Sequence, residues 1–186
     1  DNLPFRSRLI ESNALLNYHL FKDSPVSKVV IGNDGWLFYN PPKEDSDPIG
    51  QASGYRLSDE LLQQTAQNLT NMNDWLKERN KDFGILICPN KESVYYDEMP
   101  KYYNTESTST SDQLYEYLTK NTDIKVAHPK ISIAAAKKNN PDFEFYYKTD
   151  THWNDLGAYL GAKSLLEQFN ITLPDLNTKN TECFVD

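Results

Sequence analysis

The residues best suited to chemistry lie in one short segment, Lys148-Thr149-Asp150-Thr151-His152-Trp153-Asn154. If this segment is extended, side chains two positions apart point the same way, so Asp150 and His152 share one side. A carboxylate beside an imidazole can accept the Nδ1–H, fix the tautomer and stabilise the imidazolium that forms when Nε2 takes a proton. The pair therefore suits the base and the orienting acid of a hydrolase or acyltransferase triad.

Two other interpretations of this pair stay open. Asp150 can cap a turn while His152 is a surface residue. Both side chains can also bind zinc or manganese, but such a site needs at least a third ligand. The other histidines, His19 and His128, stand in no recognisable ligand spacing. We therefore expect neither a metal nor another cofactor.

The elements that must position this segment follow from the hydrophobic periodicity. Helices are predicted at 4–20, 58–80, 111–121, 130–138 and 154–169, and strands at 28–31, 36–39, 83–88, 124–127 and 143–147. Asn33-Asp34-Gly35 suits the turn of a tight hairpin. From residue 58 onward strands and helices alternate, which predicts an α/β fold with a mainly parallel sheet flanked by helices.

Four residues near predicted strand ends are candidates for binding substrate, because ligands of such sheets lie beyond the carboxyl ends of the strands. Lys91 can steer an acidic glycan or hold the backbone of the site. Asn90 can donate to a developing oxyanion. Tyr95 can stack against a sugar or fill a groove, and Trp153 can wall the site or pack on the following helix.

The composition excludes several classes of partner. The chain of 186 residues has 19 Lys and Arg against 27 Asp and Glu, so its net charge is −8. This charge argues against nucleic acid and against an anionic membrane face as partners. No run approaches the roughly 18 apolar residues of a spanning helix. Cys88 and Cys183 form no Cys-x-x-Cys motif, and two free thiols are favoured over one disulfide.

The segment KTDTHWNDLGAY resembles the catalytic signature of SGNH-hydrolase-like acetyltransferases of the AlgX and AlgJ type, which O-acetylate exopolysaccharides such as alginate. A related bacterial family is named for a similar DHHW motif. Three further segments are similar in order and spacing: PFRSRLI at 4–10, VVIGNDGWLFY at 29–39 and ICPNKESVYYDEMP at 87–100. The resemblance covers 4–169. It implies one incomplete SGNH-hydrolase-like domain at 1–186, with a helix and hairpin at 1–57 and an α/β part at 58–186.

Asp150 and His152 match two members of that family's Ser-His-Asp triad. The family serine stands on a later Gly-Asp-Ser-like turn, and this chain stops at Asp186 before any such turn. None of its own serines lies in a Gly-x-Ser-x-Gly or Gly-Asp-Ser context, and Ser93 is the internal candidate. We therefore expect the nucleophile downstream of this chain.

The resemblance implies O-acetylation of an extracytoplasmic polysaccharide, in the periplasm or at the cell surface, with a membrane-bound O-acyltransferase as acetyl donor. If water replaces the sugar, the same residues give a carbohydrate acetylesterase. A missing serine instead favours a non-catalytic polysaccharide-binding or assembly module, and a metal-dependent hydrolase is a weaker alternative. A Gly-Asp-Ser-like turn soon after position 186 would favour the enzyme.

Overall fold

The computed structural model describes residues 5–17, 24, 28–42, 46–103 and 108–174. Its elements are α1 (Arg6–Leu16), β1 (Val29–Ile31), β2 (Leu37–Tyr39), α2 (Pro48–Ala52), α3 (Asp59–Lys77), β3 (Gly84–Leu86), α4 (Lys91–Val94), α5 (Thr110–Asn121), β4 (Lys125–Ala127), α6 (Lys130–Asn139) and α7 (Asp155–Glu167). Within these ranges, no helix combines the length and the apolar character needed to span a membrane.

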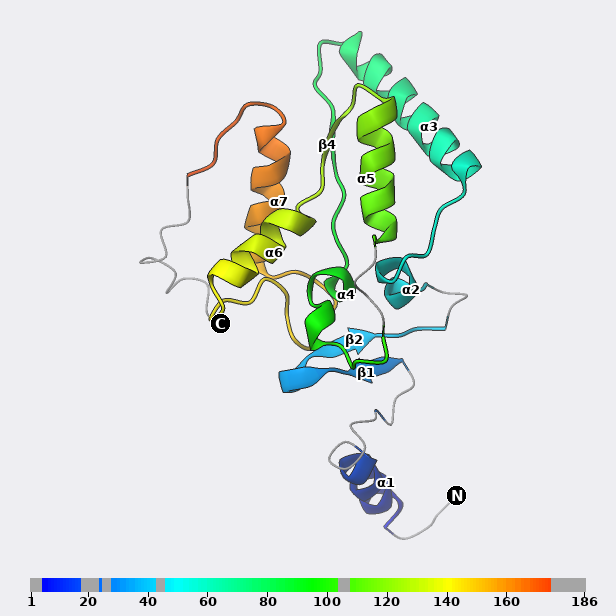
Figure 1. Cartoon of the computed structure of the whole chain (residues 1–186), viewed down its shortest axis with the longest axis vertical. Helices are drawn as coiled ribbons and strands as arrows, with labels where there is room; N and C mark the ends of the chain where they lie inside the picture. Colours follow the sequence, from blue (N-terminus) through cyan, green and yellow to red (C-terminus); the bar gives the residue numbers. More distant parts are fainter. Residues whose placement is uncertain (1–4, 18–23, 25–27, 43–45, 104–107, 175–186) are drawn as a thin grey trace.

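A parallel pair of strands, β3 and β4, lies between two layers of helices. Figure 1 shows α3 and α5 on one side of this pair and α6 and α7 on the other. Helix α5 packs on β4, and α7 packs on both strands. A buried cluster of Ala66, Leu118, Ile124 and Val126 joins α3 and α5 to the strands. This arrangement confirms the predicted α/β architecture.

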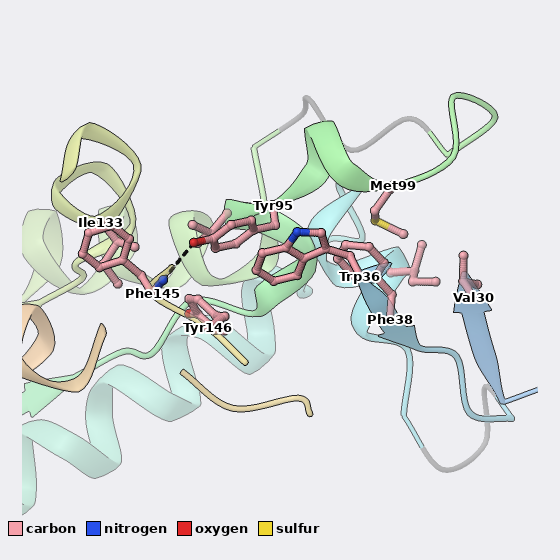
Figure 2. Packing of buried hydrophobic residues seen from close by; sticks show 10 residues of the cluster. Val30, Trp36, Phe38, Tyr95, Met99, Ile133, Phe145 and Tyr146 are labelled. Atoms are coloured by element: carbon pink, nitrogen blue, oxygen red, sulfur yellow. Dashed lines mark hydrogen bonds between the residues drawn. The ribbon is translucent and has the colours of Figure 1, made fainter. Parts of the chain in front are cut away.

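The second sheet is the predicted hairpin of β1 and β2, which pair antiparallel. Asp34 and Gly35 at its tip have φ angles of 46° and 84°, the left-handed region that such turns require. The hairpin carries Trp36 into the larger core cluster, where its ring stacks on Tyr95 with centroids 4.0 Å apart. Figure 2 shows these rings beside Phe38 and Tyr146.

The segment before α7 differs from the prediction of a strand at 143–147. Only an isolated antiparallel bridge joins Tyr146 to Trp153. The backbone N–H of Tyr147 donates to the carbonyl of His152 at 3.2 Å, and that of Asn154 donates to the carbonyl of Phe145 at 3.1 Å. The chain thus folds back on itself between 146 and 153 instead of running straight from strand to helix.

Two short helices and the exposure of α1 also differ from the prediction. Two short helices, α2 and α4, occupy stretches without a predicted helix. All four residues of α4 are buried, so tertiary packing stabilises a helix too short to form alone. Helix α1 lies within the helix predicted at 4–20, but it has no buried residue. Leu9, Ile10 and Leu15 are more than half exposed, and Figure 1 shows α1 apart from the other helices.

Candidate active site

Asp150 and His152 form a close pair in the loop before α7. Oδ1 of Asp150 lies 2.6 Å from Nδ1 of His152 and accepts a second hydrogen bond from the backbone N–H of His152 at 2.8 Å. Because a carboxylate oxygen only accepts, Nδ1 carries the proton and Nε2 is the basic nitrogen. The backbone and ring hydrogen bonds from His152 lower the pKa of the Asp150 carboxyl, which keeps it ionised.

The pairing arises from a turn and not from an extended link. Asp150 bonds the backbone N–H two residues later, which is the pattern of an Asx-turn, and residues 148–152 are bent. One oxygen of Asp150 therefore does both things that were considered for this residue: it caps the turn and it orients the base. Among the described residues no hydrogen bond reaches Nε2 of His152, and the imidazole side chain is 79% exposed. Nε2 is therefore open to a reacting group.

Lys91 holds this loop in place through hydrogen bonds from its ammonium group. Its side chain is buried, and Nζ donates to the carbonyls of Leu37 at 2.5 Å, Tyr147 at 3.2 Å, Lys148 at 3.1 Å and Asp150 at 2.7 Å. The ammonium therefore ties the loop to β2 of the hairpin. Of the two roles considered for Lys91, this geometry favours holding the backbone over steering a substrate.

The surroundings of the Lys91 ammonium explain how a charge is accommodated there. Burial lowers its pKa, whereas the charges of Glu92 and Asp150 act in the opposite direction. The rings of Phe38 and Trp36 lie 5.2 and 5.6 Å from Nζ, within the range of cation–π contacts. With three N–H donors and four carbonyl acceptors, the ammonium has no hydrogen to spare for a ligand.

Trp153 combines the two roles considered for it. It lines a cleft beside His152, and it also packs on α7. A Cβ added at Gly161 would lie 2.7 Å from the indole ring, and one at Gly157 would lie 2.8 Å from the Cβ of Trp153. The two glycines therefore leave room for the indole against the helix. This close packing fixes the backbone that follows His152.

Asn90 and Tyr95 lie in different environments. Asn90 lines the cleft, and its amide Nδ2 donates to Oε1 of Gln51 at 3.1 Å. Tyr95 is 2% exposed, and its hydroxyl accepts the backbone N–H of Phe145 at 2.9 Å, drawn as a dashed line in Figure 2. Burial raises the pKa of Tyr95 to about 12. Tyr95 therefore fills the core and positions residue 145, and a sugar has no access to its ring.

The cleft encloses about 580 Å³ between the hairpin, α2 and α4, within the roughly 300–1,000 Å³ of small-molecule sites. Sequence reasoning missed several of its lining residues, among them Tyr39, Gln51, Cys88 and Glu92. Glu92 is the least expected, because its carboxyl is buried. Burial raises the pKa of Glu92, opposed by backbone hydrogen bonds from Glu92 itself and Tyr39. Its place directly after Lys91 at a strand end was the available signal.

Cys88 and His128 are the remaining candidates for thiol or metal chemistry in the described part of the chain. Cys88 is a free thiol there, and burial raises its pKa, while Cys183 and His19 lie outside the described residues. His128 is buried between the carbonyl of Ile87 and the carboxylate of Asp112. No group of three potential ligands occurs among the described residues.

Ser46 and Ser93 line the cleft and a neighbouring cavity, and each is a candidate nucleophile. Ser93 is buried and donates its hydroxyl to the carbonyl of Asn90 at 2.8 Å. It lines a neighbouring cavity and is absent from the described lining of the His152 cleft. Ser46 does line that cleft, in the stretch just before α2. Neither hydroxyl forms a hydrogen bond with His152 in the described structure.

Comparison with known proteins identifies the family. A sequence model described as "SGNH hydrolase-like domain, acetyltransferase AlgX" matches residues 29–185. The chain belongs to this AlgX family. Two curated relatives, both named probable alginate O-acetylase AlgJ, are 26% identical over 155 residues (Pseudomonas putida) and 30% identical over 156 residues (Pseudomonas aeruginosa). These alignments take in 83% and 82% of this chain but 37% and 35% of the relatives.

Solved structures show the same fold. PatB1 of Bacillus cereus matches with a TM-score of 0.56 and 19% identity over 82% of this chain and 47% of that chain. The O-acetyltransferase domain of Pseudomonas putida AlgJ matches with a TM-score of 0.52 and 21% identity over 76% of this chain and 47% of that one. This AlgX-family chain thus spans about a third of its curated relatives and about half of these solved chains. The fold is SGNH-hydrolase-like, in agreement with the resemblance.

Proposed function

We propose that this AlgX-family chain is the part of an O-acetyltransferase that carries the base and its orienting acid, and that the enzyme acetylates an extracytoplasmic polysaccharide. The observation that carries the proposal is the 2.6 Å contact between Asp150 and Nδ1 of His152, which leaves Nε2 open beside a cleft. The family match and the two relatives named alginate O-acetylases support the reaction class.

The mechanism is covalent. Nε2 of His152 takes the proton of a serine hydroxyl while the serine oxygen attacks the acetyl carbonyl of the donor. The tetrahedral intermediate collapses, the acetyl–enzyme ester forms, and the leaving group departs with the proton from His152. Nε2 then takes the proton of a sugar hydroxyl, which attacks the acetyl ester. The serine oxygen then leaves and takes this proton from His152, so the products are the O-acetylated sugar and the free serine.

The serine belongs to residues beyond Asp186 in this proposal, on the Gly-Asp-Ser-like turn that the family resemblance implies. Asp150 keeps His152 in the Nδ1–H tautomer and stabilises the imidazolium. Asn90 has a second amide N–H besides the one given to Gln51, and this N–H is a candidate donor to the oxyanion. We also propose that 1–186 belongs to one domain, that a membrane-bound O-acyltransferase supplies the acetyl group, and that the site faces the periplasm or the cell exterior.

The test is turnover of p-nitrophenyl acetate by the longer parent protein. His152→Ala should lower kcat/KM by roughly 10³-fold or more, because loss of a triad member removes base catalysis. Ser46→Ala and Ser93→Ala serve as matched controls and should keep the parental rate. Mass spectrometry after a short reaction should find the acetyl group on a serine beyond Asp186. A parental rate in His152→Ala, or an acetyl group on Ser46 or Ser93, would contradict the proposal.

A non-catalytic polysaccharide-binding module is the second candidate function. It is favoured by the absence of a nucleophile hydrogen-bonded to His152 among the described residues. The same assay separates the two, since a module would bind glycan and show no turnover that depends on His152. If acetyl groups pass only to water, the enzyme is an acetylesterase.

A further inference from the structure

Among the residues that the structure describes, the cleft beside His152 offers no free cation to an acidic substrate. Its described lining holds no arginine, and its one lysine is Lys91. The Lys91 ammonium is buried and is already shared among four backbone carbonyls. Lys148, a lysine of the loop that carries His152, pairs with Glu144 at 3.0 Å. No described lining residue is therefore left to neutralise a substrate carboxylate.

The cleft does hold carboxyl groups. Glu92 lines the cleft with 3% of its surface exposed, and Asp150 stands at its edge through His152. A substrate carboxylate brought into this space would lose water, gain no counter-ion from the described lining and lie near the ionised carboxylate of Asp150. Burial of an unpaired charge is costly, so the cleft disfavours an acidic sugar.

The same lining suits sugar hydroxyls. Gln51 and Asn90 present amides, which both donate and accept hydrogen bonds. Glu92 accepts from a hydroxyl when ionised and can donate when protonated. Tyr39 and Trp153 add aromatic rings, which pack on apolar faces while leaving polar edges free. These groups recognise neutral polyols without a formal charge on the ligand.

We propose that the acceptor of this cleft is an uncharged, hydroxyl-rich glycan and not a polyuronate. The proposal rests on the acetyltransferase function proposed above and adds its substrate class. It separates this chain from its relatives named alginate O-acetylases, because alginate carries a carboxylate on each sugar. The charges of the lining thus set the preference for a neutral over an acidic acceptor. Asp150 and His152 act in the transfer itself.

The experiment compares two acceptors of equal length with the full parent protein: a neutral cello-oligosaccharide and a mannuronate oligomer. Titration calorimetry should show binding of the neutral oligomer at least about tenfold tighter than the mannuronate at low salt. With p-nitrophenyl acetate as donor, mass spectrometry should find acetyl groups mainly on the neutral oligomer. Added salt should leave the neutral oligomer unaffected and improve mannuronate binding, since screening weakens like-charge repulsion.

Two variants test the cause of the preference. Glu92→Gln removes a carboxyl group that can ionise beside the ligand, and it should raise mannuronate binding several-fold. Gln51→Lys places a new cation in the cleft and should do the same, which keeps the test valid if Glu92→Gln fails to fold. Glu116→Gln is the control, because Glu116 is exposed and outside the described cleft lining, and it should leave the preference unchanged.

The outcomes separate this inference from the proposed function. Equal or tighter mannuronate binding would overturn the inference even if His152→Ala abolished turnover. Binding of neither oligomer would also overturn it. Loss of the proposed function would appear instead as p-nitrophenyl acetate turnover that does not depend on His152. Calorimetry would still measure the acceptor preference in that case.

Discussion

Asp150 uses one carboxylate oxygen for two hydrogen bonds, one to the backbone N–H of His152 and one to its ring. The backbone bond sets the turn, and the ring bond sets the tautomer. Because both groups are largely exposed, their contact adds little to stability and matters mainly for the protonation pattern of His152. An amide at this position should therefore keep the turn and lose the tautomer.

Asp150→Asn in the parent protein should lower kcat by roughly 10²–10⁴-fold, since Asn can donate to Nδ1 and favour the wrong tautomer. The melting temperature should stay close to that of the parent, because Asn still accepts the backbone N–H. Parallel measurement of kcat and thermal unfolding checks both statements. A loss of stability as large as the loss of rate would instead mean that Asp150 acts only as a cap.

Lys91→Met should lower the free energy of unfolding by about 2–4 kcal/mol, because four carbonyls lose a buried charged donor. The loop that carries His152 should move with them, so kcat of the parent should fall as well. Urea unfolding and turnover are the measurements. Lys148→Met is the matched control, as its ammonium is more exposed, and it should change stability by less than about 1 kcal/mol. A Lys91→Met protein with parental stability and rate would refute the positioning role.

At the scale of the helices and strands, the carboxylate of Asp112 ties the start of α5 to the sheet. Asp112 accepts hydrogen bonds from the backbone and hydroxyl of Ser109, and Nζ of Lys130 lies 2.5 Å away. His128 spans from Asp112 to the carbonyl of Ile87 just after β3. Burial raises the pKa of Asp112, but the bonds from Lys130 and Ser109 outweigh it and lower this pKa to about 2.

This lowered pKa predicts acid-dependent stability. A carboxyl whose pKa falls on folding stabilises the protein above its unfolded pKa of about 3.9 and loses that contribution as pH falls toward 2. With a discount for partial exposure, the contribution is about 1–2 kcal/mol. Asp112→Asn should be less stable by this amount at pH 7 in urea unfolding, and the difference should close between pH 4 and 2. Exposed Asp123→Asn should differ little at either pH. A gap that persists at pH 2 would rule out the ionic origin.

At the scale of the whole molecule, the described fold matches part of several solved chains. The chain spans 47–49% of the solved chains that share its fold. The strands of the parallel pair are three residues long, and every residue of β3 is only partly buried. Parallel strands are normally covered on both faces, and here α3 and α5 lie on one side of the pair and α6 and α7 on the other.

The 186-residue chain alone should therefore show no turnover of p-nitrophenyl acetate above that of its His152→Ala variant, because the proposed serine lies beyond Asp186. The longer parent should show turnover that depends on His152. Both proteins are compared at equal concentration, with circular dichroism to confirm that the short chain folds. Turnover by the short chain that His152→Ala abolishes would place the nucleophile within residues 1–186.

Local patterns in the sequence were enough to predict much of this protein. The spacing of apolar residues predicted α3, α5, α6 and α7, and Ser58 and Asn154 cap α3 and α7. The turn at Asp34 and Gly35 also follows from residue type, since only short-range backbone geometry is involved. Asp150 and His152 were recognised as a pair for the same reason, because they are two positions apart.

Tertiary structure decided what depends on residues far apart in the chain. The buried side chain of Lys91 bonds carbonyls 54 to 59 positions away, so the sequence alone could not choose between its two possible roles. In place of the strand predicted at 143–147, the chain folds back at 146–153, and the carbonyl of Lys148 accepts hydrogen bonds from both Lys91 and the backbone N–H of Leu37. The cleft itself, with Gln51 and Glu92 brought beside His152, exists only once α2 and α4 pack together. Long-range packing sets burial, and burial determines which charges stay free for a ligand.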